Sequence, residues 1–219
     1  MPNLYPAFER QEVVVHTPAH RTSLAELTTG ELAVVAEAWA ARAQAAREEG
    51  FGYVHALVND GRGSGASREH THSQLVWLRE PPPAVAAELP NLAAAGCALC
   101  ALLARDDLAV AERAGVRLLA APAGRLPYEL LIAPTGHRPA GLAGGEPLAP
   151  ALDLAAEGLR RLRALHPGAP ANIWLHEGGH WHLELVPRLA ELGGIELGAG
   201  IFVNTAAPEA AAAALREAI

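Results

Sequence analysis

The stretch Asn59-Asp-Gly-Arg-Gly-Ser-Gly-Ala-Ser67-Arg-Glu-His70-Thr-His72-Ser-Gln74 decides the fold of this chain, because it joins a glycine-rich loop to a His-x-His pair. Strand side chains alternate between two faces, so a His-x-His pair within one strand places both imidazoles on one face. A second pair, His180-Trp-His182, follows later. Each pair is preceded by a proline-containing loop ending in histidine and by a strand containing asparagine: Pro18-Ala-His20 and Asn59 before the first, Pro134-Thr-Gly-His137 and Asn172 before the second. This repetition predicts an internal duplication.

The composition is typical of a globular protein and argues against nucleic-acid binding. Hydrophobic residues make up 51% of the 219 residues, the net charge is −7, and all the positive charge is arginine with no basic stripe, so broad phosphate neutralisation is not expected. From the first residues, which lack a charged region followed by an apolar run, we expect no signal peptide, and the apolar stretches are too short to predict a membrane span. The only two cysteines form Cys97-x-x-Cys100, a spacing that suits metal or redox chemistry better than a framework disulfide. We therefore expect a cytoplasmic protein.

Hydrophobic periodicity and turn residues predict an α+β fold with mostly antiparallel sheet. Glycine-rich and proline-rich residues 138–148 are expected to form a mobile loop. The boundary between the two halves is expected at about 82–95, near three consecutive prolines. The expected helices are 31–48, 148–165 and 208–218; the expected strands are 13–17, 53–58, 70–78, a hairpin over 109–121 that turns at Ala114-Gly115, 128–133, 171–175, 180–186 and 198–203.

The two cysteines favour a zinc site. Thiolates combined with imidazoles suit tetrahedral Zn²⁺, and His137 and His180 would complete a Cys2His2 set with Cys97 and Cys100. Two alternatives remain open at this point. The cysteines could be buried and inert, or they could carry thioredoxin-like redox chemistry, although no thioredoxin-like strand and helix pattern precedes them.

The first His-x-His pair favours phosphoryl chemistry. Gly61, Gly63 and Gly65 allow backbone N–H groups to approach an anion closely. A neutral imidazole at His72 could attack phosphorus directly, while Gln74 and Ser67 hold the non-bridging oxygens that gain charge in the transition state. The alternative is a glycine-rich turn followed by a strand whose histidines are simply hydrogen-bonded.

The pattern Asn59-x-Gly-x3-Gly-Ala-Ser67-x2-His70-x-His72-Ser-Gln74 resembles the active-site signature of the galactose-1-phosphate uridylyltransferases, in the histidine-triad superfamily. The flanking stretches Glu12-Val-Val-Val-His-Thr-Pro-Ala-His20, His180-Trp-His-Leu-Glu-Leu-Val-Pro-Arg188 and Gly194-Ile-Glu196-Leu-Gly-Ala-Gly200 are also similar to that family. The resemblance covers nearly the whole chain. It implies two tandem histidine-triad-like units with mostly antiparallel sheets and packed helices, residues 1–85 with the catalytic His-x-His and residues 86–219 with the zinc site.

The resemblance also implies roles for individual residues. His72 would be the nucleotidylated nucleophile, and Gln74 would hold the phosphoryl oxygens. Glu196 would reach the sugar of the substrate, in the family across a dimer interface. Asn59, Gly65 and Ser67 would surround the phosphates. Cys97, Cys100, His137 and His180 would match the second structural zinc of some members, whereas other members bind metal through positions that match Glu88, His176, His180 and His182.

The chain departs from the family pattern at its start. Family chains begin with a further segment that carries its own Cys-x-x-Cys, so this chain is expected to be an N-terminally short member. His20 and His70 match ligands of the family's first zinc but lack its thiolate partners here. We therefore expect them to be hydrogen-bonded residues rather than a metal site.

Three functions follow from these observations. The first is a ping-pong nucleotidyltransferase that moves a nucleoside monophosphate, UMP by resemblance, between a nucleotide-sugar and a hexose 1-phosphate through a covalent histidine. The second is a histidine-triad hydrolase or phosphorylase, in which water or phosphate is the acceptor. The third is a zinc-stabilised, non-catalytic dimeric module. In each case zinc is the expected cofactor, and a homodimer the expected assembly.

Overall fold

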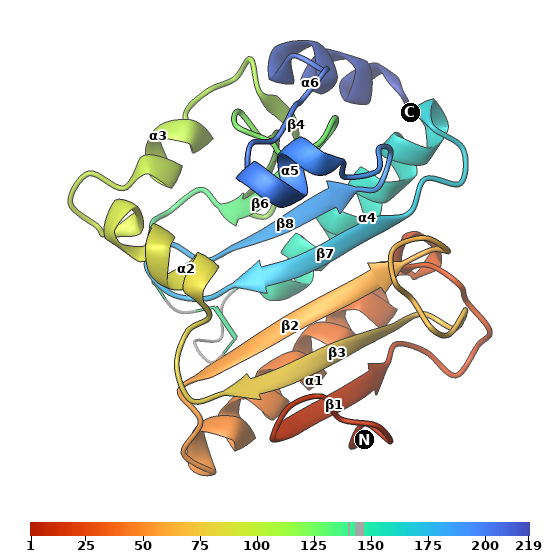
Figure 1. Cartoon of the computed structure of the whole chain (residues 1–219), viewed down its shortest axis with the longest axis vertical. Coiled ribbons are helices and arrows are strands. Elements are labelled where there is room, and N and C mark those ends of the chain that lie inside the picture. Colours follow the sequence, from red (N-terminus) through yellow and green to blue (C-terminus); the bar gives the residue numbers. More distant parts are fainter. Residues whose placement is uncertain (140, 143–146) are drawn as a thin grey trace.

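One eight-stranded antiparallel sheet runs through the whole molecule in the computed structural model, which describes residues 1–139, 141–142 and 147–219 (Figure 1). The strand order is β1-β3-β2-β7-β8-β6-β5-β4. The strands are β1 (Arg10–Val15), β2 (Tyr53–Asp60), β3 (His72–Leu78), β4 (Ala109–Arg113), β5 (Val116–Ala120), β6 (Leu130–Pro134), β7 (Ala171–His176) and β8 (His182–Pro187). This architecture confirms the α+β prediction.

Two long helices, α1 (Thr29–Glu48) and α4 (Leu148–Leu165), cover one face of this sheet (Figure 1). α1 begins at a capping box, in which the Thr28 hydroxyl accepts from the Glu31 N–H and the Glu31 carboxylate accepts from the Thr28 N–H. Trp39 of α1 is fully buried in the core between helix and sheet. The shorter helices are η1 (Leu24–Glu26), α2 (Pro83–Glu88), η2 (Leu89–Leu92), α3 (Ala98–Leu103), α5 (Gly194–Ala199) and α6 (Pro208–Glu217).

The two halves meet where β2 pairs with β7, and the register there relates them. Leu57 lies opposite Trp174 across this junction. Leu57 is also opposite Gln74 in β3, and Trp174 is opposite Glu184 in β8. Leu57 and Trp174 therefore occupy equivalent places beside an approximate two-fold axis, and Gln74 is equivalent to Glu184.

The same register corrects one expectation from the sequence. Asn59 and Asn172 are cross-strand neighbours rather than equivalents. The residue equivalent to Asn59 is His176, since each lies two residues beyond the junction residue on its own strand.

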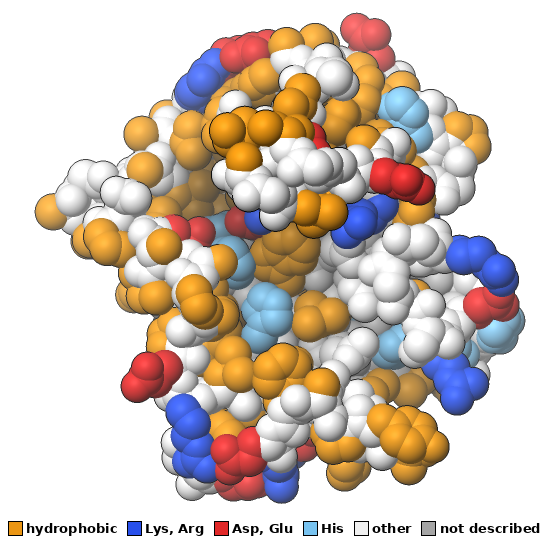
Figure 2. Space-filling model, viewed as in Figure 1, with side chains coloured by type: hydrophobic (Ala, Val, Ile, Leu, Met, Phe, Trp, Pro, Cys, Tyr) orange, Lys and Arg blue, Asp and Glu red, His pale blue; other side chains and the backbone are white. Residues whose placement is uncertain are grey.

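The face of the sheet opposite α1 and α4 carries Gln74 of the first half and its equivalent Glu184 of the second. On β3, Ser73, Leu75 and Trp77 are buried, while His72 and Gln74 alternate with them on the other face. Figure 2 views this second face and shows histidine side chains beside hydrophobic ones near its centre. Both halves of the chain therefore place polar side chains on this one face of the sheet.

Most expected elements are confirmed, including the hairpin turn at Ala114 and Gly115, both at positive φ. The strand expected over 198–203 is wrong: Gly194–Ala199 form helix α5, which ends at Gly200 with φ 67°. The first histidine of each pair precedes its strand, contrary to the expected strands 70–78 and 180–186. The Thr71 N–H donates to the Arg21 carbonyl, and the Trp181 N–H donates to the Arg138 carbonyl, rather than to a neighbouring strand. Residues 140 and 143–146 of the loop expected over 138–148 lie outside the described residues. No helix among the described residues has the length and apolar character needed to cross a membrane.

Candidate functional site

His72 opens β3 with its imidazole in a defined orientation. Its Nδ1 lies 2.8 Å from the carbonyl oxygen of His70. A carbonyl can only accept, so Nδ1 donates this hydrogen bond, and in the neutral imidazole the lone pair is on Nε2. The side chain is partly exposed on the open face of the sheet. The geometry therefore directs Nε2, the nitrogen that would act as a nucleophile in the neutral imidazole, away from the His70 carbonyl.

A buried polar network holds the strand under His72 in place. His16 lies 2.9 Å from the Thr71 hydroxyl through Nδ1 and 3.1 Å from the Ser73 hydroxyl through Nε2. The indole N–H of Trp39 donates to the same Ser73 oxygen at 2.7 Å. Burial, with smaller contributions from His72 and His70, lowers the pKa of His16 to about 3. His16 is therefore neutral at physiological pH and links both neighbours of His72, while Trp39 ties Ser73 to helix α1.

Gln74 is oriented by a residue that the sequence alone did not single out. The backbone N–H of Ala7 donates to Oε1 of Gln11 at 2.9 Å, so the Gln11 amide nitrogen faces the other way. That nitrogen donates to Oε1 of Gln74 at 2.6 Å. The NH2 group of Gln74, on the same face as His72, thus has no hydrogen-bond partner among the residues that the structure describes. Only the pairing of β1 with β3 reveals this role of Gln11, because the two glutamines are far apart in the sequence.

The glycine-rich loop and Asn59 lie near the end of β3 that begins with His72. Gly61, Gly63 and Gly65 have φ values of 85°, 96° and 90°, which favour glycine. Asn172 bridges the loop to the sheet by donating to Oδ1 of Asn59 at 2.8 Å and to the carbonyl of Ser64 at 2.7 Å. Ser67 is exposed on the loop. A cavity of about 740 Å³ beside the loop is lined by Asn59, Ser67 and His70 together with Arg62, Arg68 and Arg163.

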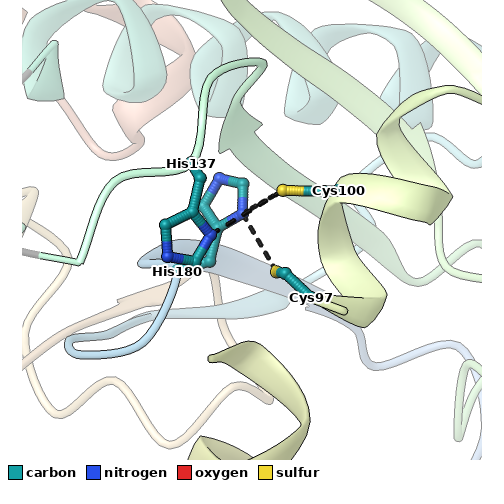
Figure 3. A group of neighbouring side chains, drawn as sticks. All are labelled: Cys97, Cys100, His137 and His180. Carbon is teal, nitrogen blue, oxygen red and sulfur yellow. Dashed lines mark hydrogen bonds between the residues drawn. The ribbon is translucent and has the colours of Figure 1, made fainter. Parts of the chain in front are cut away.

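Cys97, Cys100, His137 and His180 converge on one point, as the sequence predicted (Figure 3). Nδ1 of His180 lies 3.4 Å from each sulfur, and Nδ1 of His137 lies 3.7 Å from Sγ of Cys100. With Zn–S about 2.3 Å and Zn–N about 2.0–2.1 Å, tetrahedral geometry separates sulfur from nitrogen by about 3.5 Å. The observed distances fit Zn²⁺ well.

The second nitrogen of His180 supports the same interpretation. Nε2 lies 2.9 Å from the carbonyl of Pro134, so it carries the proton and leaves the Nδ1 lone pair facing the sulfurs. Burial lowers the pKa of His180, which favours the neutral form that a ligand needs. Cys97 precedes α3 and Cys100 lies in its first turn, so the helix sets the spacing of the two sulfurs. All four residues can bind one ion, and no ligand position is left for substrate.

Three other residues named in the sequence analysis, Glu196, His20 and His70, are not part of the cysteine and histidine cluster. Glu196 lies on α5 in the second half, where its carboxylate accepts from the Gly193 N–H at 2.8 Å; β3 and His72 lie in the other half (Figure 1). His20 and His70 have ring centroids 5.6 Å apart. Nε2 of His70 lies 2.8 Å from the carbonyl of Thr17, a hydrogen bond of the kind expected from the sequence.

A further group of possible ligands stands on the open face: Glu88, His176, His182 and Glu184. The sequence comparison with family members named the first three together with His180. Glu184 was missed, although its position two residues after His182 on one strand places it on the same face.

Comparison with known proteins supports the family resemblance that the sequence around His72 indicates. Residues 6–82 match the family described as galactose-1-phosphate uridyl transferase, N-terminal domain. An ADP-glucose phosphorylase from Arabidopsis thaliana is 27% identical over 238 residues, an alignment that covers 96% of this chain and 65% of that protein. The chain thus spans about two thirds of the length of the curated relative that it matches.

Two solved structures are similar along nearly the whole chain. A GalT-like protein from Arabidopsis thaliana has 25% identity and a TM-score of 0.90, covering 99% of this chain and 82% of that one. A uridylyltransferase has 25% identity and a TM-score of 0.91, covering 100% of this chain and 84% of that one. These matches confirm the resemblance to the galactose-1-phosphate uridylyltransferase family, in the histidine-triad superfamily, that the residues around His72 indicate.

Proposed function

We propose that this chain is a nucleotidyltransferase that transfers a nucleoside monophosphate from a nucleotide-sugar through a covalent intermediate on His72. The observation that carries the proposal is the orientation of this imidazole: Nδ1 donates to the His70 carbonyl, and Nε2, on the open face, makes no hydrogen bond within the described part of the chain. In the first half-reaction Nε2 attacks the α-phosphorus of the nucleotide-sugar. A P–N bond forms, the P–O bond to the sugar phosphate breaks, and a sugar 1-phosphate leaves.

The surrounding residues have supporting roles in this reaction. The free NH2 group of Gln74 would donate to a non-bridging oxygen, and the positive-φ glycines would let backbone N–H groups approach the phosphates. The leaving sugar phosphate is already a stable anion, so the site needs no acid to protonate it. In the second half-reaction an acceptor phosphate attacks the nucleotidyl-histidine, and the P–N bond breaks.

Zinc at Cys97, Cys100, His137 and His180 would be structural in this proposal. Four protein ligands close the coordination sphere, and the ion would join α3 to the loop before β8. The ion would supply folding energy rather than chemistry at the phosphate.

Two candidate functions differ in the molecule that accepts the nucleoside monophosphate from His72. Transfer of UMP to a hexose 1-phosphate is the version that the family resemblance implies. A phosphorylase, in which inorganic phosphate is the acceptor and a nucleoside diphosphate the product, is favoured by the 27% identical ADP-glucose phosphorylase. Incubating the loaded protein with either acceptor separates the two by product.

We also propose that the active unit is a homodimer with Glu196 reaching across the interface to the sugar. The apolar side chains around Glu196 support this, since Ile195, Leu197 and Ile201 are 49%, 73% and 58% exposed. The test is transfer from UDP-glucose or ADP-glucose to a sugar 1-phosphate in mixtures of two variants, His72→Gly, which cannot be loaded, and Glu196→Gln, in which transfer to the acceptor is slow. Recovery of activity supports a shared site, whereas no recovery at any ratio contradicts it.

A further inference from the structure

Asn172, on β7 of the second half, lies in the same cross-strand row as the proposed nucleophile. Pairing of β2 with β3 ends at Val58 opposite Ser73, so the next residues along, Asn59 and His72, are neighbours. Asn59 lies opposite Asn172 in β7. Val58 and Ser73 are buried on the helix side of the sheet, so Asn59 and His72 stand on the open face. Residues directly opposite each other share a face and have Cβ atoms about 4.5–5.5 Å apart, so Asn172 completes this row.

The amide of Asn172 is held in one orientation by its neighbours. The Ser64 carbonyl can only accept, so the end of the Asn172 amide that lies 2.7 Å from it is the NH2 group. The same nitrogen donates to Oδ1 of Asn59 at 2.8 Å. At the other end of the amide, Nη1 of Arg188 donates to Oδ1 of Asn172 at 3.4 Å. Turning this amide over would place its oxygen against the Ser64 carbonyl.

The orientation of Asn172 sets that of Asn59. Because Oδ1 of Asn59 accepts from Asn172, the NH2 group of Asn59 points elsewhere. It faces the glycine-rich loop, since a Cβ atom added at Gly65 would lie 3.8 Å from Nδ2 of Asn59. This NH2 group has no hydrogen-bond partner among the described residues. A donor without a partner therefore stands between the loop and His72.

A donor and an acceptor at this place have opposite effects on a phosphoryl group. The non-bridging oxygens of a phosphate ester accept hydrogen bonds, so an NH2 group stabilises them and a carbonyl oxygen repels them. The two ends of an asparagine amide have nearly the same shape, and Asn59 by itself has no preference for either. The contact with Asn172 supplies that preference.

We propose that Asn172 is a positioning residue for the nucleotidyl transfer: it holds the NH2 group of Asn59 towards an oxygen on the phosphorus that bonds to His72. The inference rests on the proposed function. It makes the catalytic half of the chain depend on a residue of the other half, across the junction of β2 with β7.

Asn172→Asp tests this role with little change of shape. The aspartate keeps an oxygen that can accept from Arg188, but it brings a carboxylate oxygen against Oδ1 of Asn59. To avoid two facing acceptors, the Asn59 amide must turn over and present its oxygen to the phosphate. Single-turnover loading of His72 from UDP-glucose or ADP-glucose should slow by about 10- to 150-fold, the effect of one hydrogen bond to a charged group.

A double-mutant cycle shows whether Asn172 acts through Asn59. In an Asn59→Ala background, Asn172→Asp should slow loading further by less than about threefold, because the residue that it orients is gone. Equal slowing in both backgrounds would overturn the proposal, since Asn172 would then act through its contact with the loop at Ser64. If Asn172→Asp does not fold, Asn172→Ala takes its place in the same comparison.

A sulfur probe separates an oriented donor from a general loosening of the fold. A nucleotide-sugar with one sulfur on the α-phosphorus exists as two diastereomers, which place the sulfur at one or the other non-bridging position. Sulfur is a weak acceptor, so Asn172→Asp should slow the isomer whose sulfur faces Asn59 much less than the other isomer. Equal slowing of both isomers would overturn the proposal.

Asn204→Asp is the matched control, because the Asn204 amide also donates to two acceptors, the backbone carbonyls of Gly124 and Leu126 in the second half. Thermal unfolding measures what losing such contacts costs in stability, and loading of His72 should be unchanged. Slowing as large as that of Asn172→Asp would overturn the proposal. No loading by the wild type would overturn the proposed function itself, whereas normal loading by both the wild type and Asn172→Asp would overturn this inference alone.

Discussion

The orientation of Gln74 can be reversed by changing Gln11 alone. Gln11→Glu keeps the size of the side chain and an oxygen that can accept from Ala7, but it brings a carboxylate oxygen against Oε1 of Gln74. To avoid two facing acceptors, the Gln74 amide must turn over. Its oxygen, rather than its NH2 group, would then face a phosphoryl group bound at His72.

The expected loss follows from one hydrogen bond to a charged group, worth about 1.5–3 kcal/mol. That energy corresponds to a fall of about 10- to 150-fold in the rate of His72 loading. The assay is single-turnover release of sugar 1-phosphate from UDP-glucose and ADP-glucose. Gln11→Met, which removes the donor without adding repulsion, should lose less than about 10-fold, since Gln74 can still adopt its productive orientation for part of the time.

Two results would refute this reasoning. If Gln11→Glu loads His72 as fast as the wild type, the amide orientation does not matter. If Gln11→Met is as slow as Gln11→Glu, general disturbance of β1 explains the effect. Thermal unfolding of both variants provides the control for stability.

Three further predictions concern metal, pH and substrate. Cys97→Ser should lower zinc content by one equivalent and reduce the melting temperature; unchanged values of both by elemental analysis and calorimetry would count against a structural zinc. Because the pKa of His16 is held at about 3 in the folded state, below its usual 6.5, the unfolded chain takes up the proton first, and His16 costs up to about 1.4 kcal/mol of stability per pH unit as the pH falls from about 6.5 towards 3. Urea unfolding between pH 7 and pH 5 should therefore show a shallower pH dependence in His16→Gln, and an identical slope would contradict the role of this residue. Glu196→Gln should slow transfer to the sugar phosphate acceptor much more than loading of His72, and equal slowing of both half-reactions would argue against a role in sugar recognition.

The sequence predicted what depends on local pattern. Alternating residues in β3, the capped helix α1 and the Cys-x-x-Cys spacing all act within a few residues, so the pattern is enough to identify them. The convergence of Cys97 with His180 was also predictable, because the family resemblance pairs these distant positions.

Features that depend on strand register could not be predicted in the same way. The contact between Gln11 and Gln74 exists only because β1 lies beside β3 in one particular register. The same holds for the equivalence of Asn59 with His176, which the asparagine pattern had assigned to Asn172. The run Gly198–Val203 looked like a strand, but a glutamate cap and the positive-φ Gly200 make a helix of the residues before it.

Direct detection of the covalent intermediate tests the central claim. The protein is incubated with UDP-glucose or ADP-glucose, quenched in alkali, digested and examined by mass spectrometry for a nucleoside monophosphate on a histidine. We predict an acid-labile adduct on His72, absent in His72→Gly although that variant stays folded. No adduct from either nucleotide-sugar, or an adduct on His182 instead, would contradict the account.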